Sequence, residues 1–394
     1  MDFASRQRWR LAKVETTSTL SPHAGRDVRQ DSEGRPFRRL VVGLTFLALA
    51  CIVSPTHSAE RSASATITGA VEGFVKPAYA AFHNSTAALK SSVGELCAGP
   101  SPAALDAARA AFSETTRAWS EVEIIRIGPV TEENRLERVL YWPDRKSIGL
   151  KQVQAAIAER DASVTDTARL AEKSVAMQGL GALEFVLFGT GSEELAKGEA
   201  FRCSYGAAIS GNLDTIAETV EKGWEDPSGF GASWANPSSS NAFYRTDAEA
   251  LTDLLEVFIS GTELVRDQRI NSFLGETEKA DKPKQALYWR SQGTAEALGG
   301  NMAGMKALFD ASDLAGTLPA NSRWIAQSIN FELGNAIRAA EGASGPIDEV
   351  LADPTRRGKV AYFKLVTTSL SELFGKRLSA ELGLTAGFSS LDGD

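Results

Sequence analysis

One carboxylate lies in a strongly apolar stretch of the chain. In the window 177–189, MQGLGALEFVLFG, the polar side chains are Gln178 and Glu184. A helix that is apolar on all sides is typical of the centre of a bundle, so we expect Glu184 to be buried. A buried carboxylate needs a cation, a metal ion or a proton as its partner. Glu184 is therefore the first candidate for a functional residue.

A purely structural explanation of Glu184 stays open at this point. The carboxylate can pair with an arginine such as Arg126 or Arg117. Gly179 and Gly181 can serve close helix packing, because they remove side-chain volume at a cost of roughly 1 kcal/mol each in helix propensity relative to alanine. The residues alone do not decide between a salt bridge and a ligand site.

The composition limits the chemistry that this chain can perform. It has 394 residues with 42 Lys+Arg, 50 Asp+Glu, three His and three Cys, and a net charge of −8. The negative charge repels phosphate, so we expect no nucleic-acid partner. Three His and three Cys are too few for the usual zinc-ribbon, iron–sulfur and multi-His centres. The scarcity of His also argues against Ser-His-Asp catalysis. Any metal must be bound mostly by oxygen.

The first 65 residues have the pattern of an export leader. An uncharged apolar run, residues 40–53 (LVVGLTFLALACIV), follows Arg35, Arg38 and Arg39 and precedes small residues. This order is typical of a secretory signal peptide, and the run is too short to span a bilayer comfortably. A membrane anchor or a buried helix is the alternative. We expect the mature protein to be exported, with His83 as its single histidine.

Two cysteines, Cys97 and Cys203, remain after the leader. In an oxidising compartment a sparse, even pair predicts a disulfide, and two buried free thiols are the alternative. Closing a loop of roughly 100 residues contributes about 4–5 kcal/mol in the chain-entropy model.

The body of the chain has helical periodicity throughout. Apolar residues recur every seven positions at Val75, Phe82, Leu89 and Leu96, and Pro77 marks either the start of this helix or a kink. No alternating run of strand length accompanies the helical pattern. Further helices are expected after this one, over about 105–125, 133–142, 148–160, 165–188, 204–224, 246–271, 284–310, 321–341 and 357–382. The sequence predicts an all-α protein.

A stretch without helical period divides this helical body. Residues 225–242 (EDPSGFGASWANPSSSNA) concentrate Pro, Gly, Ser and Asn. We therefore expect an N-terminal helical bundle over 66–224, an irregular crossover over 225–242, and a C-terminal helical bundle over 243–394.

The phrase QGLGALEFVLFG at 178–189 resembles the signature helix of the imelysin family of exported bacterial proteins. Further landmarks follow in the family's order: Trp119, Glu123, Arg126, Gly128, Pro129, Trp142, Pro143, Arg202, Cys203, and the run Tyr288 to Ser291. The likeness spans roughly residues 66 to 394. It implies an all-α protein with two helical-bundle domains, in a family that includes a nominal metallopeptidase and iron-regulated and iron-uptake-associated members.

One departure from the family pattern affects the expected chemistry. The family motif is Gly-x-His-x-x-Glu, with His and Glu on one helical face as a metal site requires. In this chain the glycine is Gly179 and the glutamate is Glu184, but Gly181 stands where the family has His. Zinc is therefore not expected, and the metallopeptidase becomes the alternative to a binding protein.

Iron remains chemically reasonable because ferric iron favours carboxylate oxygen and does not require His. The candidate ligands are Glu184, Glu123 and Asp144, with His83 as a further candidate. Each has a simpler explanation: Asp144 can cap the helix that starts near Ile148, and His83 can be packed or solvated.

The sequence and the resemblance together predict a periplasmic binding component associated with iron uptake. It would present a pocket around Glu184 to a membrane or outer-membrane partner, with Fe³⁺ or Fe²⁺ as the metal. The alternatives are a metallopeptidase of the imelysin type and a structural or partner-docking module without metal. The sequence does not decide the oligomeric state.

Overall fold

The first helical layer is built on one long helix that begins the described part of the chain. In this computed structural model, residues 62–144 and 146–384 are described. α2 (Ala63–Ala70) continues through a π-helical turn (Val71–Val75) into α3 (Lys76–Ala98). Pro77 has no backbone N–H and so cannot donate a helical hydrogen bond. A π-helical turn, in which the hydrogen bonds span five residues, lies directly before it. The helical run therefore passes through Pro77 and begins at Ala63.

α3 packs on two further long helices, α4 and α9, whose apolar faces form the core of this half of the chain. Ser101 caps the start of α4 by accepting from the amide of Ala104. The remaining helices of this half are short and lie between α4 and α9 in the chain. The helices are α4 (Pro102–Val122), α5 (Arg135–Val139), α6 (Ile148–Glu159), α7 (Thr167–Ala171), α8 (Leu180–Phe188) and α9 (Ala200–Glu225).

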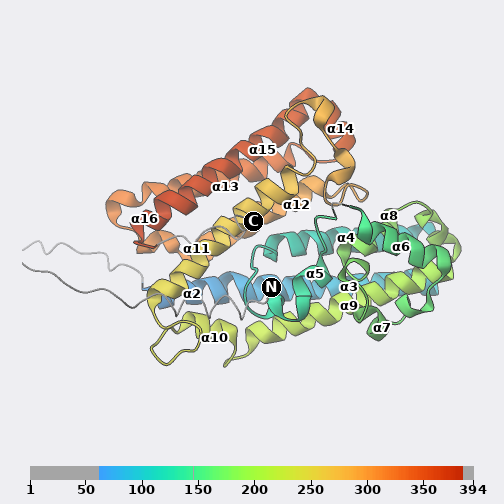
Figure 1. Cartoon of the computed structure of the whole chain (residues 1–394), viewed down its shortest axis with the longest axis horizontal. Coiled ribbons are helices and arrows are strands. Elements are labelled where there is room, and N and C mark those ends of the chain that lie inside the picture. The colour runs from blue at the N-terminus through green and yellow to red at the C-terminus, as the bar shows by residue number, and fades with distance from the viewer. Residues whose placement is uncertain (1–61, 145, 385–394) are drawn as a thin grey trace, which may run out of the picture. The chain divides into compact units, whose positions relative to one another are not determined.

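A second set of helices follows the expected crossover. α12 packs on both α13 and α4, and α13 packs on α15 (Figure 1). The 225–242 segment is not wholly irregular, because it contains the short helix α10. The helices are α10 (Phe230–Ala235), α11 (Asp247–Glu263), α12 (Thr294–Ser312), α13 (Trp324–Glu341), α14 (Ile347–Ala352), α15 (Pro354–Glu372) and α16 (Ser379–Glu381). π-helical turns, Leu264–Ile270 and Leu373–Leu378, extend α11 and join α15 to α16.

The all-α prediction is confirmed for the described residues, which contain no β-strand. Helices from the two sides of the crossover pack closely, and Gly304 of α12 lies against the backbone of α4. A Cβ at Gly304 would overlap the carbonyl oxygen of Glu121. Residues 62–144 and 146–384 belong to one compact unit. The division into two bundles is thus not confirmed and stays a prediction.

Three predicted helices differ in detail from the observed ones. The expected helix over 165–188 is broken into α7, a 3₁₀ turn at Val175–Met177 and α8. The expected helix over 133–142 shortens to α5, after which Leu140 is extended. The expected helix over 284–310 begins only at Thr294. Before it lie a 3₁₀ turn at Pro283–Gln285 and a segment with left-handed residues at Tyr288 and Gln292. Glycine and proline near each break explain the interruptions.

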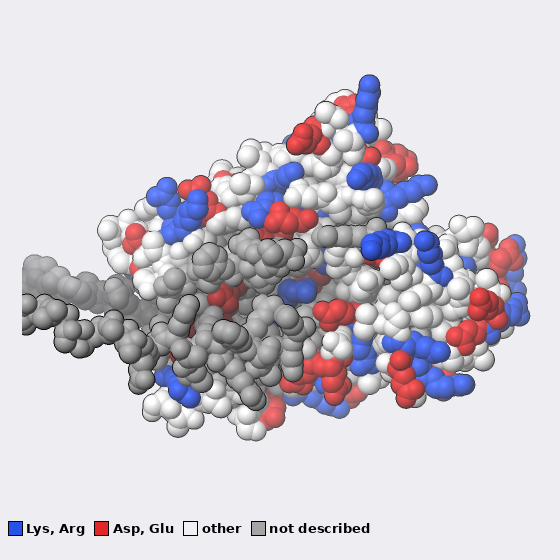
Figure 2. Space-filling model, in the orientation of Figure 1, with Lys and Arg blue, Asp and Glu red and all other residues white. Residues whose placement is uncertain are grey.

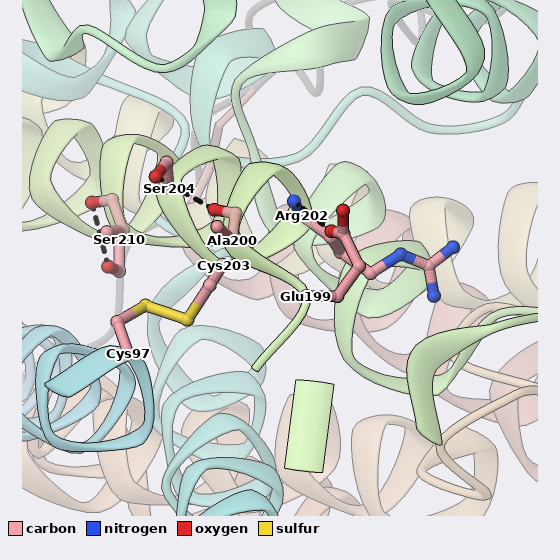
Figure 3. Close-up of a disulfide and its surroundings, with 8 residues drawn as sticks. Cys97, Glu199, Ala200, Arg202, Cys203, Ser204 and Ser210 are labelled. Atoms are coloured by element: carbon pink, nitrogen blue, oxygen red, sulfur yellow. Dashed lines mark hydrogen bonds between the residues drawn. A yellow bond between two sulfur atoms is a disulfide. The ribbon is translucent and has the colours of Figure 1, made fainter. Parts of the chain in front are cut away.

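The predicted disulfide is confirmed. Cys97 at the end of α3 is bonded to Cys203 near the start of α9, with 5.6 Å between their Cα atoms (Figure 3). It closes a loop over a sequence separation of 106. The bond thus joins the ends of two helices that already pack side by side.

The predicted signal segment at 40–53 lies outside the described residues. Within residues 62–144 and 146–384, none of the helices has both the length and the apolar character that crossing a bilayer requires. Figure 2 shows acidic and basic side chains interspersed on the face that it presents, apart from the grey atoms.

Candidate functional site

α8 is positioned by a close approach of backbone to backbone. Its N-cap residue, Gly179, is extended, and a Cβ there would lie 2.5 Å from the carbonyl oxygen of Val139 in α5. Only glycine fits this contact without a shift of one chain segment. The seven buried residues of α8 then fix its orientation in the core, and Glu184 among them is 4% exposed. The predicted burial of Glu184 is confirmed.

Glu184 holds a loop that comes from the other side of the crossover. Its Oε1 accepts hydrogen bonds from the amides of Arg290 and Ser291, at 3.1 and 3.0 Å, and from Ser291 Oγ at 3.0 Å. Arg290 Nη1 lies 3.8 Å from Oε2. Burial raises the pKa of Glu184, and the Ser291 hydrogen bonds and the Arg290 charge oppose that rise.

The alternative of an arginine partner for Glu184 thus holds, but the partner is Arg290, and the suggested Arg126 and Arg117 are wrong. Arg117 instead bonds to two exposed acids of its own helix, Glu114 at 2.7 Å and Glu121 at 2.9 Å. Residues three and four apart on a helix are neighbours, so this local pairing needs no tertiary contact.

The loop that Glu184 holds has an unusual backbone. Tyr288 and Gln292 adopt left-handed conformations, with φ of 57° and 62°. Such conformations cost of order 1–3 kcal/mol each for a residue other than glycine, so they persist where the surroundings over-determine them. The hydrogen bonds to Glu184 between these two positions supply that constraint.

A second carboxylate, Glu123, is buried at the end of α4 and is 1% exposed. Arg269 Nη2 lies 2.7 Å from its Oε2, and Asn301 Nδ2 donates to its Oε1 at 2.8 Å. Arg269 comes from the π-helical turn after α11 and Asn301 from α12. Truncating one member of such a buried pair leaves an uncompensated charge, which costs about 3–5 kcal/mol. Glu123, Arg269 and Asn301 therefore hold together the end of α4, the π-helical turn after α11, and α12.

Tyr288 is influenced by the charges of both buried carboxylates. Burial raises the pKa of Tyr288 well above its ordinary value, and the nearby Glu123 and Glu184 raise it further while Arg269 opposes them. Its hydroxyl has no hydrogen-bond partner in the structure. The Glu184 loop and the Glu123–Arg269 pair are thus electrostatic neighbours.

A cavity of about 230 Å³ opens beside the Glu123–Arg269 pair. It is walled by the end of α4, by α5 and the segment after it, and by the π-helical turn after α11. Three leucines and Pro143 provide apolar surface. The charged and aromatic residues that line it are Glu123, Arg126, Glu137, Arg269, Trp119, Tyr141 and Trp142.

The four predicted metal ligands do not converge. Asp144 accepts from the amides of Ile148 and Leu150 at 2.8 and 3.1 Å, so it caps α6 as the alternative explanation had it. His83 of α3 lies with Nδ1 against Glu221 Oε2 and with Nε2 3.7 Å from Asp214 Oδ1. Across the described ranges 62–144 and 146–384, no group of three His, Cys, Asp or Glu side chains is arranged to hold a metal ion. Iron binding stays a prediction.

The family model described as Imelysin (Peptidase_M75) matches residues 75–373. The chain belongs to the imelysin family. One relative is the Iron-regulated protein A of Synechococcus elongatus, which is 24% identical over 345 residues, covering 84% of this chain and 90% of the relative.

Two solved structures share the fold. An Imelysin-like protein from Psychrobacter arcticum aligns with a TM-score of 0.65 at 20% identity, covering 83% of this chain and 98% of its own. A structure from Parabacteroides distasonis, named for an iron-regulated protein A precursor, aligns with a TM-score of 0.64 at 14% identity, covering 81% and 95%.

Several landmarks of the imelysin resemblance meet at the cavity. Trp119, Glu123, Arg126, Trp142 and Pro143 all line it. Gly128 and Pro129 lie just beyond α4, where the left-handed Gly128, with φ of 69°, turns the chain and a Cβ would lie 2.8 Å from a ring carbon of Phe230. The family's landmarks thus shape this wall.

At the position of the imelysin histidine, Gly181 is exposed, and a Cβ there would meet nothing within 4 Å. An imidazole at this position would face open space. The substitution by glycine therefore removes a polar group without being required by packing.

The sequence did not point to Arg269 or Asn301, which hold Glu123. Arg269 ends a polar run at 266–269 (RDQR) between the buried Val265 and Ile270, so no local signal marked it as buried. Its acidic partner is 146 positions away in the chain, so no local spacing links them. The run Tyr288 to Ser291 is part of the family resemblance, but its spacing does not predict that it binds Glu184.

Proposed function

We propose that this imelysin-family protein is an exported binding component of iron acquisition, and that it receives its ligand in the cavity beside Glu123 and Arg269. The observation that carries the proposal is the cavity itself, at about 230 Å³, with five landmark residues of the family in its wall. The relative named Iron-regulated protein A, matched over 84% of this chain, supports the link to iron.

Binding is favoured over catalysis by what the carboxylates already do. Oε1 of Glu184 accepts three hydrogen bonds, and both oxygens of Glu123 have partners. A peptidase metal centre needs protein ligands that are free to coordinate and an open position for water. Glu184 would have to release the 290–291 loop to serve there, and Gly181 offers no imidazole.

The same contacts bear on how iron would be bound. A side-chain cage of Glu184, Glu123, Asp144 and His83 would require each residue to leave its present partner. We therefore propose that the iron, as Fe³⁺ or Fe²⁺, comes with a ligand that supplies most of its oxygen donors, which suits the hard ferric ion. The protein would act in the periplasm and pass its ligand to a membrane or outer-membrane partner.

One part of the structural alternative is supported by a specific observation. Glu184 joins α8 to the 288–292 loop through four polar contacts. We propose that the family glutamate serves in this chain to hold that loop in place, while the cavity takes the ligand.

Equilibrium dialysis of the full chain against radioactive iron tests the proposal. Iron is offered as Fe(III) nitrilotriacetate, as ferric citrate and as Fe(II), with Zn(II) in parallel, and peptide hydrolysis is followed with and without a chelator. We expect iron to be retained from at least one complexed form and no peptide hydrolysis. Retention of no iron form at about 100 μM, roughly −5.5 kcal/mol, overturns the binding function. Hydrolysis that a chelator abolishes establishes the peptidase instead.

A further inference from the structure

We infer that the cavity beside Glu123 and Arg269 binds a small organic anion through a carboxylate, with Arg126 as its principal charged contact. This inference rests on the proposed function and names the chemical class of its ligand. It is argued from which hydrogen-bonding groups of the cavity are engaged and which are not.

The buried polar atoms of the lining residues that lack a hydrogen-bond partner are donors. Arg126 is exposed, lines the cavity, and makes no hydrogen bond or ion pair within 4 Å to another described residue. The indole nitrogens of Trp119 and Trp142, two further lining residues, are buried and have no hydrogen-bond partner. Buried N–H groups are seldom left unpaired in proteins, so an acceptor is the expected complement.

The acceptors of the wall are mostly occupied. Both carboxylate oxygens of Glu123 are bonded, to Arg269 and Asn301. Arg269 thus neutralises Glu123, and its Nε and Nη1 have no partner of their own. Glu137, the other lining carboxylate, is exposed. The buried atoms of the lining residues that lack a partner are thus all donors, and together with the charge of Arg126 they favour a ligand that brings an acceptor with negative charge.

Guanidinium chemistry narrows the ligand further. A planar guanidinium presents paired N–H donors that match a carboxylate or a phosphate. The leucines and indole rings of the wall favour a ligand with carbon next to its charge, which a carboxylate supplies and inorganic phosphate does not. The volume of about 230 Å³ lies below the roughly 300–1,000 Å³ of drug-sized sites, so the ligand is small.

Calorimetric titration of the metal-free full chain tests this inference. The probes are citrate, its uncharged trimethyl ester and inorganic phosphate. The variants are Arg126→Gln and Trp142→Phe, with Arg117→Gln as the matched control because Arg117 is an exposed arginine of α4 outside the cavity. Circular dichroism and urea unfolding verify that each variant is folded.

We expect citrate to bind and the ester not to. Arg126→Gln should weaken citrate binding by about tenfold or more, the loss of a hydrogen bond to a charged group. Trp142→Phe should weaken it less, and Arg117→Gln should leave it within about twofold, as for a surface charge. No citrate binding to the folded wild type, equal binding of citrate and ester, preference for phosphate, or equal effects of Arg126→Gln and Arg117→Gln would each overturn the inference.

The outcomes separate this inference from the proposed function. Iron retention that is unchanged by Arg126→Gln sustains the iron function and removes the anion site. Citrate binding that depends on Arg126, without retention of any iron form, sustains the anion site and removes the iron function.

Discussion

Glu184 Oε1 accepts both the amide N–H and the hydroxyl of Ser291, a residue 107 positions further along the chain. A motif residue expected at the centre of a metal site thus serves first as an anchor for a loop. The contact joins a helix of one side of the crossover to a segment of the other. It also explains how two left-handed residues, Tyr288 and Gln292, are tolerated.

Removing this anchor should destabilise the fold. Glu184→Ala leaves the amides of Arg290 and Ser291 and the Arg290 charge without their acceptor, so we expect a loss of about 2–4 kcal/mol in the free energy of unfolding. Glu121→Ala, which removes an exposed ion pair, should cost less than about 1 kcal/mol. Urea unfolding measures both, and equal losses would contradict the anchor.

The pH dependence of stability should reveal the raised pKa of Glu184. The folded state then holds its proton to a higher pH than the unfolded state, whose carboxyl titrates near the ordinary value of 4.5. The wild type therefore loses stability relative to Glu184→Gln as pH rises from about 4.5 through the folded-state pKa. Urea unfolding of both proteins at several pH values measures this difference. A stability difference that stays constant with pH, or that changes in the opposite direction, would show that burial does not dominate the pKa of Glu184.

Reintroducing the family histidine gives a sharp test of the site. Gly181→His should fold, because a side chain there meets nothing within 4 Å and glycine is costly in a helix. It should not create tight zinc binding, because Glu184 remains bound to Arg290 and Ser291. Titration with Zn(II) measures this. A micromolar zinc site in the variant, absent from the wild type, would show that Glu184 leaves its loop readily.

The close contact of α12 with α4 should tolerate no added volume. Gly304→Ala places a methyl group against the Glu121 carbonyl oxygen and should cost about 1–3 kcal/mol or more. Gly358 is an exposed glycine of α15 whose Cβ would meet nothing within 4 Å. Gly358→Ala should therefore stabilise the protein by up to about 1 kcal/mol through helix propensity. Thermal unfolding compares the two, and a neutral Gly304→Ala would be inconsistent with the observed packing.

The disulfide should contribute strongly to stability. Replacing Cys97 and Cys203 together by serine opens a loop with a sequence separation of 106. We expect a loss of about 4–5 kcal/mol in the chain-entropy model. Urea unfolding with and without reductant measures it. Reductant should lower the midpoint of the wild type and leave the double variant unchanged, and an unaffected wild type would contradict the prediction.

Local sequence patterns predicted the features that depend on residues close together in the chain. The seven-residue spacing from Val75 to Leu96 predicted the buried face of α3, and the isolation of Glu184 among apolar residues predicted its burial. The position of Asp144 before Ile148 was enough to suggest a helix cap, which the hydrogen bonds confirm.

What the sequence could not give is the pairing of distant groups. Arg269 meets Glu123 across 146 positions, and Arg290 meets Glu184 across 106. Neither spacing has a period, and arginines nearer to Glu184 were equally plausible partners. The helix expected over 165–188 was broken because Gly179 approaches the backbone of α5, a tertiary contact that outweighs helical periodicity.

The contact at Gly304 has a consequence for motion. Backbone packed this closely between α12 and α4 resists hinge bending between the two sides of the crossover, because opening would separate close-packed surfaces. The cavity already has exposed residues, Arg126 and Glu137, in its wall, so a small molecule can reach it without a hinge movement. Exchange of ligand then leaves the packing of α12 on α4 unchanged.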